Sequence, residues 1–244
     1  MGSRREGAEG GGPAGLEARD RLILALDVPT PEDALGIVDA TRGLVGCYKV
    51  GLELLFAGGL DLVRRLKGEG ERVFLDVKLH DIGNTVGGAV ARIVALGADF
   101  LTVHAYPQTM AAAVAARGDA PLKLLAVTVL TSMDDADLSA AGYREGVAAT
   151  VAMRAVQARA AGVDGLVSSA REAAAVRALA GPGLSIVTPG IRLPGGAAGD
   201  QKRVVTPADA IRAGSDLLVV GRPITAAPDR RAAAEAFLSA IAAA

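Results

Sequence analysis

The sequence predicts an α/β protein, a (β/α)₈ TIM barrel, from three observations. Short apolar runs alternate with longer amphipathic runs from residue 22 to the C-terminus. Eight such apolar runs fit into roughly 220 residues, which is the usual size of this barrel. The runs are almost uninterrupted by polar residues, as expected of parallel strands that are buried on both faces.

The eight expected strands are taken in chain order, and a helical pattern separates each from the next. They cover 22–28, 47–51, 72–78, 99–105, 122–130, 165–169, 184–190 and 216–221. After the second strand, Leu55, Leu62 and Leu66 follow helical spacing, and the run 144–162 does so before the sixth. Thr30-Pro31 and Thr206-Pro207 each place a capping hydroxyl before a first-turn proline, which indicates helix starts.

An open, doubly wound sheet is the alternative fold. Six strands usually suffice for that fold, and its first strand-to-helix turn carries a glycine-rich fingerprint when it binds a dinucleotide. The corresponding turn here reads "DVPTPED" and has no glycine. The barrel is therefore the preferred fold class.

The composition indicates one domain without the features of a nucleic-acid-binding or membrane protein. We expect a disordered tail over 1–20 and a single barrel domain over 21–244. The formal net charge of −1 and the absence of Trp argue against a nucleic-acid partner, and no apolar stretch approaches the roughly 18 residues of a membrane span. The single cysteine, Cys47, suits a reduced, cytoplasmic protein.

The barrel fold predicts where chemistry should occur, because active sites lie at the C-terminal ends of the strands. Polar or loop-forming residues collect at those ends: Asp27, Lys49, Asp76, Lys78, His104, Thr131, Ser168, Ser169, Pro189, Arg192, Gly221 and Arg222.

The third strand, "RVFLDVK", ends in charged residues. Alternation along a strand puts Asp76 and Lys78 on one face, roughly 6–7 Å apart, with Lys49 about 5 Å away on the neighbouring strand. A lysine–aspartate–lysine chain can then form in the barrel mouth. Asp81 lies in the following loop, so it either extends this chain or reaches a partner subunit.

Several kinds of chemistry fit this cluster unequally. A lysine flanked by carboxylates stays protonated and acts as a proton donor, whereas a Schiff-base lysine needs a desolvated or cationic environment. A divalent metal on Asp76 and Asp81 would compete with Lys49 and Lys78 for the same carboxylates. A purely structural ion-pair network is the remaining alternative. Burying charged groups is costly in free energy, so charges at the mouth of a barrel favour a functional site over a structural network.

The loops after the last two strands are candidates for binding a phosphate group. Gly221 allows close backbone approach, Arg222 can bind two oxygens, and Pro223 suits a first helical turn. The segment 190–205 is long, aperiodic and contains Arg192 and Gln201, so it is expected to be a lid, with an ordinary surface loop as the alternative.

Taken together, these segments resemble the orotidine 5′-phosphate decarboxylase family over residues 21–243. "DVKLHDIGNT" is similar to the signature D-x-K-x-x-D-I-P-N-T of that family, and "LALDV", "YKVG", "VTVLTS", "PGIR", "GDQKR" and "VVGRPI" match its other segments in order. The resemblance implies a cofactor-free decarboxylation of orotidine 5′-phosphate to uridine 5′-phosphate in pyrimidine biosynthesis, by a cytoplasmic homodimer.

Residue roles follow from this resemblance alone. It implies that Lys78 protonates C6 of the pyrimidine and that Asp76 lies against the substrate carboxylate. It implies that Asp27 and Lys49 bind ribose hydroxyls, and that Asp81 and Thr85 come from the second subunit. The same resemblance assigns Thr131 to the base and four residues to the phosphate end, namely Arg192, Gln201, Gly221 and Arg222.

Two departures and two alternatives accompany the resemblance. Gly83 replaces the usual proline of the signature, and "AYPQT" after His104 replaces a glycine-rich segment. The related Mg²⁺-dependent sugar-phosphate enzymes carry a glutamate where this chain has Lys49, which disfavours them here. A nucleotide-binding barrel without catalysis would be expected to lack one of the four charged residues. All four are present, namely Lys49, Asp76, Lys78 and Asp81.

Overall fold

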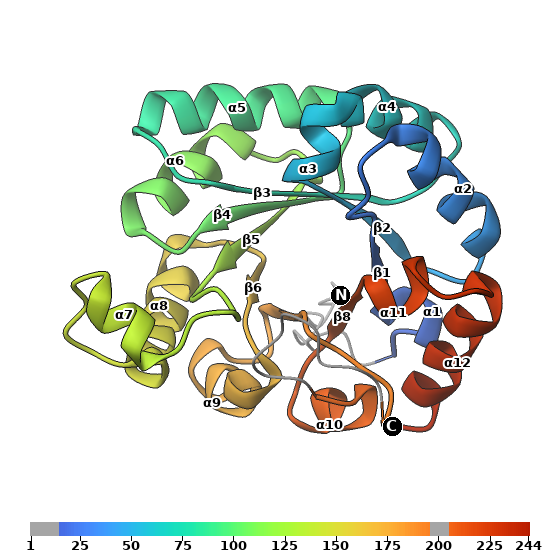
Figure 1. The fold of residues 1–244 in the computed structure, drawn as a ribbon. Helices are drawn as coiled ribbons and strands as arrows, with labels where there is room; N and C mark the ends of the chain where they lie inside the picture. Colours follow the sequence, from blue (N-terminus) through green and yellow to red (C-terminus); the bar gives the residue numbers. More distant parts are fainter. Residues whose placement is uncertain (1–14, 196–204) are drawn as a thin grey trace, which may run out of the picture.

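The protein folds as a closed barrel of eight parallel strands in the order β1 to β8, surrounded by helices (Figure 1). This computed structural model describes residues 15–195 and 205–244. The strands are β1 (Leu22–Ala25), β2 (Cys47–Gly51), β3 (Val73–Leu79), β4 (Phe100–His104), β5 (Lys123–Val127), β6 (Gly165–Val167), β7 (Ser185–Thr188) and β8 (Leu217–Val220). The predicted fold class is therefore confirmed, and each expected apolar run corresponds to one strand, although β3 ends one residue beyond the run 72–78.

Several strands are shorter than their apolar runs. The run 122–130 contains the strand Lys123–Val127, yet Val129 beyond it is also buried. Hydrophobic residues that enter the barrel mouth without pairing to a neighbouring strand read like strand residues in a sequence. Their burial, and not their backbone pairing, explains the overlong predictions.

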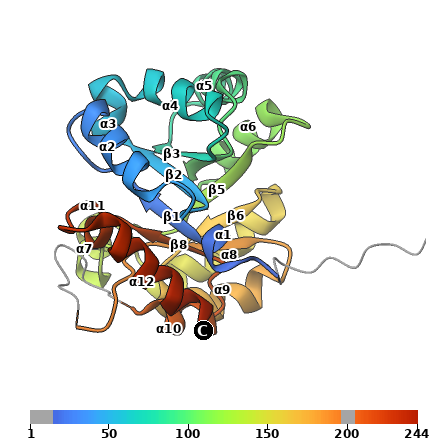
Figure 2. The same ribbon diagram turned by 90° about the vertical axis from the view of Figure 1, so that its right-hand side faces the viewer.

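Helices surround the barrel in chain order, with α2 to α6 along one half and α8 to α12 along the other (Figures 1 and 2). They are α1 (Ala18–Arg21), α2 (Pro31–Thr41), α3 (Leu52–Leu54), the π-helical turn η1 (Leu55–Gly59), α4 (Leu60–Gly68), α5 (Gly83–Leu96), α6 (Pro107–Arg117), α7 (Asp135–Ala140), α8 (Val147–Ala161), α9 (Ala170–Ala180), α10 (Pro207–Arg212), α11 (Arg222–Thr225) and α12 (Arg230–Ala242).

The two helix starts that the sequence indicated are confirmed. Thr30 precedes α2 and accepts a hydrogen bond from the backbone N–H of Asp33 at 3.1 Å. Thr206 precedes α10 and accepts the corresponding bond from Asp209 at 3.2 Å. In both helices a proline occupies the first turn, where its missing N–H would have no helical partner.

Each strand contributes one face to the barrel interior and the other to the helices. The interior cluster contains Ile23, Ala25, Cys47, Phe74, Phe100, Leu125, Val187, Leu217 and Val219. Within it the rings of Phe74 and Phe100 meet edge to face at 6.0 Å between centroids. These side chains fill the barrel below the mouth, so the polar residues at the strand ends rest on an apolar floor.

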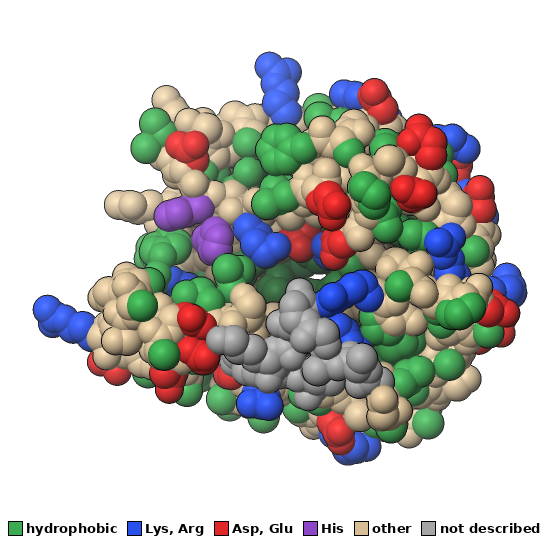
Figure 3. All heavy atoms as spheres, in the orientation of Figure 1, with side chains coloured by type: hydrophobic (Ala, Val, Ile, Leu, Met, Phe, Trp, Pro, Cys, Tyr) green, Lys and Arg blue, Asp and Glu red, His purple; other side chains and the backbone are tan. Residues whose placement is uncertain are grey.

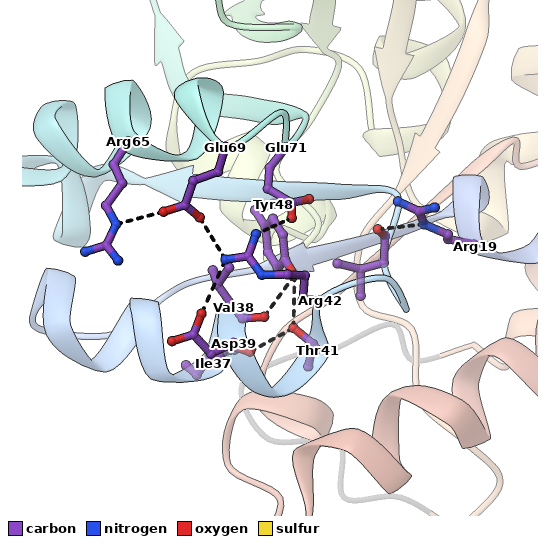
Figure 4. Close-up of polar contacts among 11 residues, drawn as sticks. Arg19, Ile37, Val38, Asp39, Thr41, Arg42, Tyr48, Arg65, Glu69 and Glu71 are labelled. Carbon is purple, nitrogen blue, oxygen red and sulfur yellow. Dashed lines mark hydrogen bonds and ion pairs between the residues drawn. The ribbon is translucent and has the colours of Figure 1, made fainter.

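The outer side of β2 is fastened to α2 by buried polar contacts (Figure 4). The Tyr48 hydroxyl donates to the carbonyl of Val38 at 3.3 Å and lies 3.3 Å from the Thr41 hydroxyl. Burial, as the largest effect, raises the pKa of Tyr48 to about 12, so it stays a neutral donor. Because Tyr48 points outward, the next residue, Lys49, points into the barrel from an anchored strand.

The same close-up shows a surface network beside this anchor. The Arg42 guanidinium pairs with Glu69 and Glu71 at 2.7 Å each, which ties the end of α2 to the loop before β3 (Figure 4). A single surface ion pair contributes little free energy. Here one arginine holds α2, which packs on β2, to the residues that lead into β3.

At the N-terminus, α1 includes residues 18–20, which the sequence analysis assigned to the tail, and it contacts α12 and β1. The domain boundary at residue 21 stays a prediction. Within the described ranges, every helix is too short or too polar to span a bilayer.

Candidate active site

A cavity of about 450 Å³ opens at the C-terminal ends of the strands. In Figure 3 acidic and basic side chains gather around the central hollow of this face. The lining residues come from strands all around the barrel: Ala25, Asp27, Lys49, Glu53, Phe74, Asp76, Lys78, Val127, Val129, Leu130, Thr131, Val167, Val187, Pro189, Gly190, Arg192, Val219, Gly221 and Arg222. The predicted position of the site is thus where the cavity lies.

Lys49 stands between two carboxylates in this cavity. Its ammonium nitrogen lies 2.9 Å from Asp27 Oδ1 and 3.2 Å from Asp76 Oδ2, and its side chain is 8% exposed. Burial by itself lowers the pKa of Lys49, but the charges of Asp76 and Asp27 outweigh it, and the pKa is raised overall. Lys49 is therefore a fixed cation.

Asp76 binds a second ammonium on its other side. Lys78 Nζ lies 2.9 Å from Asp76 Oδ1, which completes a chain Asp27–Lys49–Asp76–Lys78. Burial would raise the pKa of Asp76, yet Lys49 and Lys78 outweigh it and hold the pKa below its usual value. The lysine–aspartate–lysine chain expected from the sequence therefore forms within one subunit.

The backbone that presents Lys78 is irregular. The pairing of β3 with β4 is regular at Leu75 and Leu101 but shifts before Leu79, which pairs with Val103. Within this bulge Lys78 has φ of +50°, a left-handed conformation that costs a residue other than glycine of order 1–3 kcal/mol. Simple alternation along β3 thus predicted the correct neighbours, although the strand does not alternate regularly there.

Thr102 on β4 stabilises this bulge and was not identified from the sequence. Its hydroxyl donates to Asp76 Oδ1 at 2.9 Å and accepts from the backbone N–H of Lys78 at 3.0 Å. The side chain is fully buried. Thr102 shares strand parity with the interior residue Phe100, but parity alone does not distinguish a threonine that holds a charged neighbour from an ordinary strand threonine.

Gly51 gives the Asp27–Lys49 pair its space. A Cβ at this position would lie 2.9 Å from Asp27 Oδ1 and 3.3 Å from Lys49 Nζ. The φ of −94° is open to any residue, so a larger residue here would displace the ends of the Asp27 and Lys49 side chains and would not strain the backbone.

Asp81 and Thr85, which the sequence assigned to the site, lie outside the cavity of their own subunit. Both are exposed: Asp81 lies in the loop after β3, and Thr85 lies in the first turn of α5. Asp81 Oδ1 accepts the backbone N–H of Ile82 at 2.6 Å, and within the described chain no ion pair joins Asp81 to a lysine. Asp81 therefore does not extend the charge chain within one subunit.

The predicted phosphate end is partly assembled. Arg192, Gly221 and Arg222 all line the cavity, and Thr131 lines its wall. Burial and then the positive charge of Arg222 lower the pKa of the buried Arg192. Gln201 lies outside the described residues, as does most of the expected lid, but Ile191 pairs with Val205 and joins the two ends of that segment.

The polar residues after β4 and β6 do not join the cavity. Ser168 is buried, and Ser169 caps α9 by accepting from the backbone N–H of Arg171 at 3.3 Å. His80 stacks on Tyr106 at 4.3 Å, and His104 meets both rings edge on. Arg154 lies over the Tyr106 ring and hydrogen-bonds the Tyr143 hydroxyl at 3.0 Å.

This cluster of His80, His104, Tyr106, Tyr143 and Arg154 joins the ends of β3 and β4 to α8. Tyr106 and the neighbouring Thr109, which is 2.9 Å from His80 Nδ1, belong to the unusual segment "AYPQT". That departure from the family pattern therefore supports the loop that follows β3.

The carboxylates of Asp27 and Asp76, which line the cavity, are both paired with lysines. Across residues 15–195 and 205–244, no three His, Cys, Asp or Glu side chains cluster in a way that could hold a metal ion. The arrangement instead offers an ammonium next to a buried carboxylate, with two arginines across the cavity. Such a site can bind an anionic ligand and deliver a proton to it.

The chain is similar to known proteins along almost its whole length. The model of the Orotidine 5′-phosphate decarboxylase / HUMPS family matches residues 20–237. An orotidine 5′-phosphate decarboxylase of Rhodopseudomonas palustris is 59% identical over 232 residues, which are 95% of this chain and 98% of the relative. One of Afipia carboxidovorans is 61% identical over 224 residues, 92% of this chain and 95% of the relative.

A solved structure is similar too. The crystal structure of orotidine 5′-phosphate decarboxylase from Lactobacillus acidophilus superposes with a TM-score of 0.79 at 36% identity. The match covers 90% of this chain and 98% of that chain.

Proposed function

The chain belongs to the orotidine 5′-phosphate decarboxylase / HUMPS family and is a carboxy-lyase, and from this premise we propose how its residues carry out the reaction. The substrate is orotidine 5′-phosphate, and the products are uridine 5′-phosphate and CO₂. Lys78 is the proton donor to C6 of the pyrimidine, and no cofactor takes part.

One observation carries this proposal: the chain Asp27–Lys49–Asp76–Lys78 in the barrel mouth. A decarboxylation leaves an electron pair on the carbon that held the carboxylate. An ammonium group beside that carbon stabilises the developing negative charge and then transfers a proton to the electron pair. The carbon–carbon bond breaks, CO₂ leaves, and Lys78 becomes a neutral amine that water reprotonates.

Asp76 contributes mainly by orienting groups. Two like charges about 4 Å apart at an effective dielectric of about 20 repel by about 4 kcal/mol, whereas enzymes lower barriers by roughly 8–23 kcal/mol. Repulsion between Asp76 and the substrate carboxylate therefore supplies only part of the rate. Stabilisation of the charge at C6 by Lys78 and binding energy from the phosphate end supply the larger part.

The remaining cavity residues bind different parts of the nucleotide. Asp27 and Lys49 are suited to ribose hydroxyls, since a carboxylate accepts and an ammonium donates. Thr131 borders the base, and Arg192, Gly221 and Arg222 surround the phosphate, with Gln201 as a further predicted ligand. Two guanidinium groups on the lining of this end of the cavity suit a dianion such as a phosphate group.

A homodimer completes the site in this proposal. Asp81 and Thr85 are exposed beside Ile82, whose relative exposure is 74%, at the end of β3. Leu52, Phe56 and Leu60 are exposed after the neighbouring strand β2, with Phe56 at 86%. Exposed apolar side chains after β2 and β3, together with a carboxylate that pairs with no lysine in the described part of its own chain, fit an interface through which Asp81 reaches the Lys78 of the other subunit.

For the cellular location, the buried free thiol of Cys47 supports a reducing compartment, and the cytoplasm stays the prediction made from the sequence. Cofactor independence has a direct test: a metal chelator should leave the rate unchanged, because Asp27 and Asp76 are already paired with Lys49.

The deciding experiment is the variant Lys78→Ala. Loss of a general acid typically costs about 10²–10⁴-fold, so kcat should fall by at least about 10²-fold when loss of orotate absorbance is followed. Lys123→Ala is the matched control, because Lys123 pairs with Asp164 away from the cavity. Undiminished turnover in Lys78→Ala would refute the assigned donor.

A further inference from the structure

Thr102 connects the two central charged residues through a single hydroxyl group. The group donates to the Asp76 carboxylate at 2.9 Å and accepts the Lys78 backbone N–H at 3.0 Å. It comes from β4, the strand next to the one that carries both partners. Both hydrogen-bonding roles of the hydroxyl are thus used, and both act on residues of the charge chain.

We propose that Thr102 is a positioning residue of the decarboxylation, which keeps Asp76 in its orientation and aims Lys78 while the proton moves. This inference rests on the proposed function and adds a residue to it. Thr102 does not line the cavity, so it acts through its two partners.

The first step of the argument concerns Asp76. Its Oδ2 receives Lys49, while its Oδ1 receives both Lys78 and Thr102. When Lys78 gives its proton to the substrate, it ceases to be a charged partner of Oδ1. The Thr102 hydroxyl is neutral and fully buried, so its bond persists through that change.

The second step concerns the backbone of Lys78. The bulge between Leu75 and Leu79 places Lys78 at φ +50°, a conformation that persists only when the surroundings enforce it. The Thr102 oxygen holds the N–H of that residue from the adjacent strand. Since the Lys78 ammonium stands at the end of a flexible four-carbon chain, a shift of its backbone moves the proton donor directly.

The experiment compares Thr102→Val with Thr102→Ser. Valine has nearly the same shape but offers neither hydrogen bond, whereas serine keeps both. We expect Thr102→Val to lower kcat by about 10–100-fold, because misplacing a reacting group by about 1 Å can cost about 10²-fold. Thr102→Ser should stay within about threefold of the wild type.

Two readouts separate positioning from general damage. The KM, and the Kd for uridine 5′-phosphate, should change by less than about threefold in Thr102→Val, because ribose and phosphate contact other residues. The matched control is Thr188→Val, which removes an equally buried hydroxyl that pairs with Ser215 at 2.7 Å. It should lower the Tm while keeping kcat.

The outcomes are separable. If Thr102→Val folds and its kcat is within threefold of the wild type, or if Thr102→Ser is as impaired as Thr102→Val, the inference is wrong. If Thr102→Val does not fold, as judged by circular dichroism, Thr102→Cys decides instead: its weak donor should still lower kcat more than threefold, and a smaller loss overturns the inference. Failure of the proposed function would show differently, as full activity in Lys78→Ala.

Discussion

Asp76 is the most constrained side chain of the site, since three donors reach its two oxygens. Two of the donors are ammonium groups, and they keep the pKa of Asp76 below its usual value in spite of burial. Removing any one donor therefore leaves a charge that the others must compensate. The site works as a unit, and effects of single substitutions within it should not add.

Arg222 provides a prediction at this scale. We expect Arg222→Ala to lower kcat/KM for orotidine 5′-phosphate by about 10–150-fold, because a hydrogen bond to a charged group is worth about 1.5–3 kcal/mol. Steady-state kinetics at fixed ionic strength measures the change. Arg212→Ala, which removes an exposed arginine paired with Asp209 on α10, should leave the kinetics as they were.

That assignment fails if Arg222→Ala retains the wild-type KM and kcat. A smaller penalty with the nucleoside that lacks the phosphate is expected in addition, because the lost interaction is with the phosphate group alone.

Individual residues also mark the limit of the sequence prediction. Asp27, Lys49, Asp76 and Lys78 could be identified because charges at the ends of apolar strands are unusual. Thr102 could not be separated from an ordinary strand residue, since threonine is common in strands and one hydroxyl leaves no pattern. The left-handed conformation of Lys78 was equally hidden, because bulges depend on the partner strand.

At the scale of elements, the end of β3 depends on a cluster from other elements. His80 stacks on Tyr106. Arg154 from α8 lies over the Tyr106 ring and donates a hydrogen bond to the Tyr143 hydroxyl. The loop that carries Asp81 is thereby supported from β4 and α8. The rings of His80 and His104 meet edge to face, and neither residue is part of the cavity lining.

This cluster predicts a dependence of stability on pH. Burial, then the charges of His80, Arg154 and Lys78, lower the pKa of His104 below 6.5. The unfolded chain therefore binds a proton at His104 before the folded chain does, so stability is lost as the pH falls below about 6.5. The His104→Gln variant, which lacks this titration, should lose less stability on acidification.

Urea unfolding at pH 7.5 and pH 5.5 tests this expectation. The free energy of unfolding of the wild type should fall more between the two pH values than that of His104→Gln. Parallel pH profiles for the two proteins would contradict the assignment to His104.

At the scale of the whole molecule, the proposed dimer divides each active site between two subunits. Lys78 would come from one copy and Asp81 from the other. Variants in these two residues should therefore complement each other, which no single-subunit site could do.

The prediction is that Lys78→Ala and Asp81→Ala are each nearly inactive but regain activity when co-refolded. Half of the random dimers are hybrids with one intact site of two, so about a quarter of the wild-type activity should return. Phe56→Glu, which places a charge in the proposed interface, should abolish this recovery and give a monomer by analytical ultracentrifugation. Met153→Glu, a change at another exposed apolar residue, on α8, should do neither.

If co-refolding restores nothing although hybrids form, Asp81 does not act across the interface. Activity of a stable monomer at the wild-type level would equally exclude a shared site.

The fold as a whole was the part most accessible from the sequence. Eight buried apolar runs separated by amphipathic segments leave few other architectures, and the barrel in turn directed attention to the strand ends. What the sequence could not supply are distances between side chains from different strands. Arg192 and Arg222, for example, lie 30 positions apart, and only the closed barrel brings their charges together.

The space beside Gly51 has one more consequence. Nineteen of the twenty amino acids begin their side chain with a carbon atom that would crowd Asp27 and Lys49. A designer who wished to reshape this enzyme for another sugar could therefore move those two charged groups by enlarging this residue, without straining the backbone. The room that these two groups occupy thus depends on an atom that is missing.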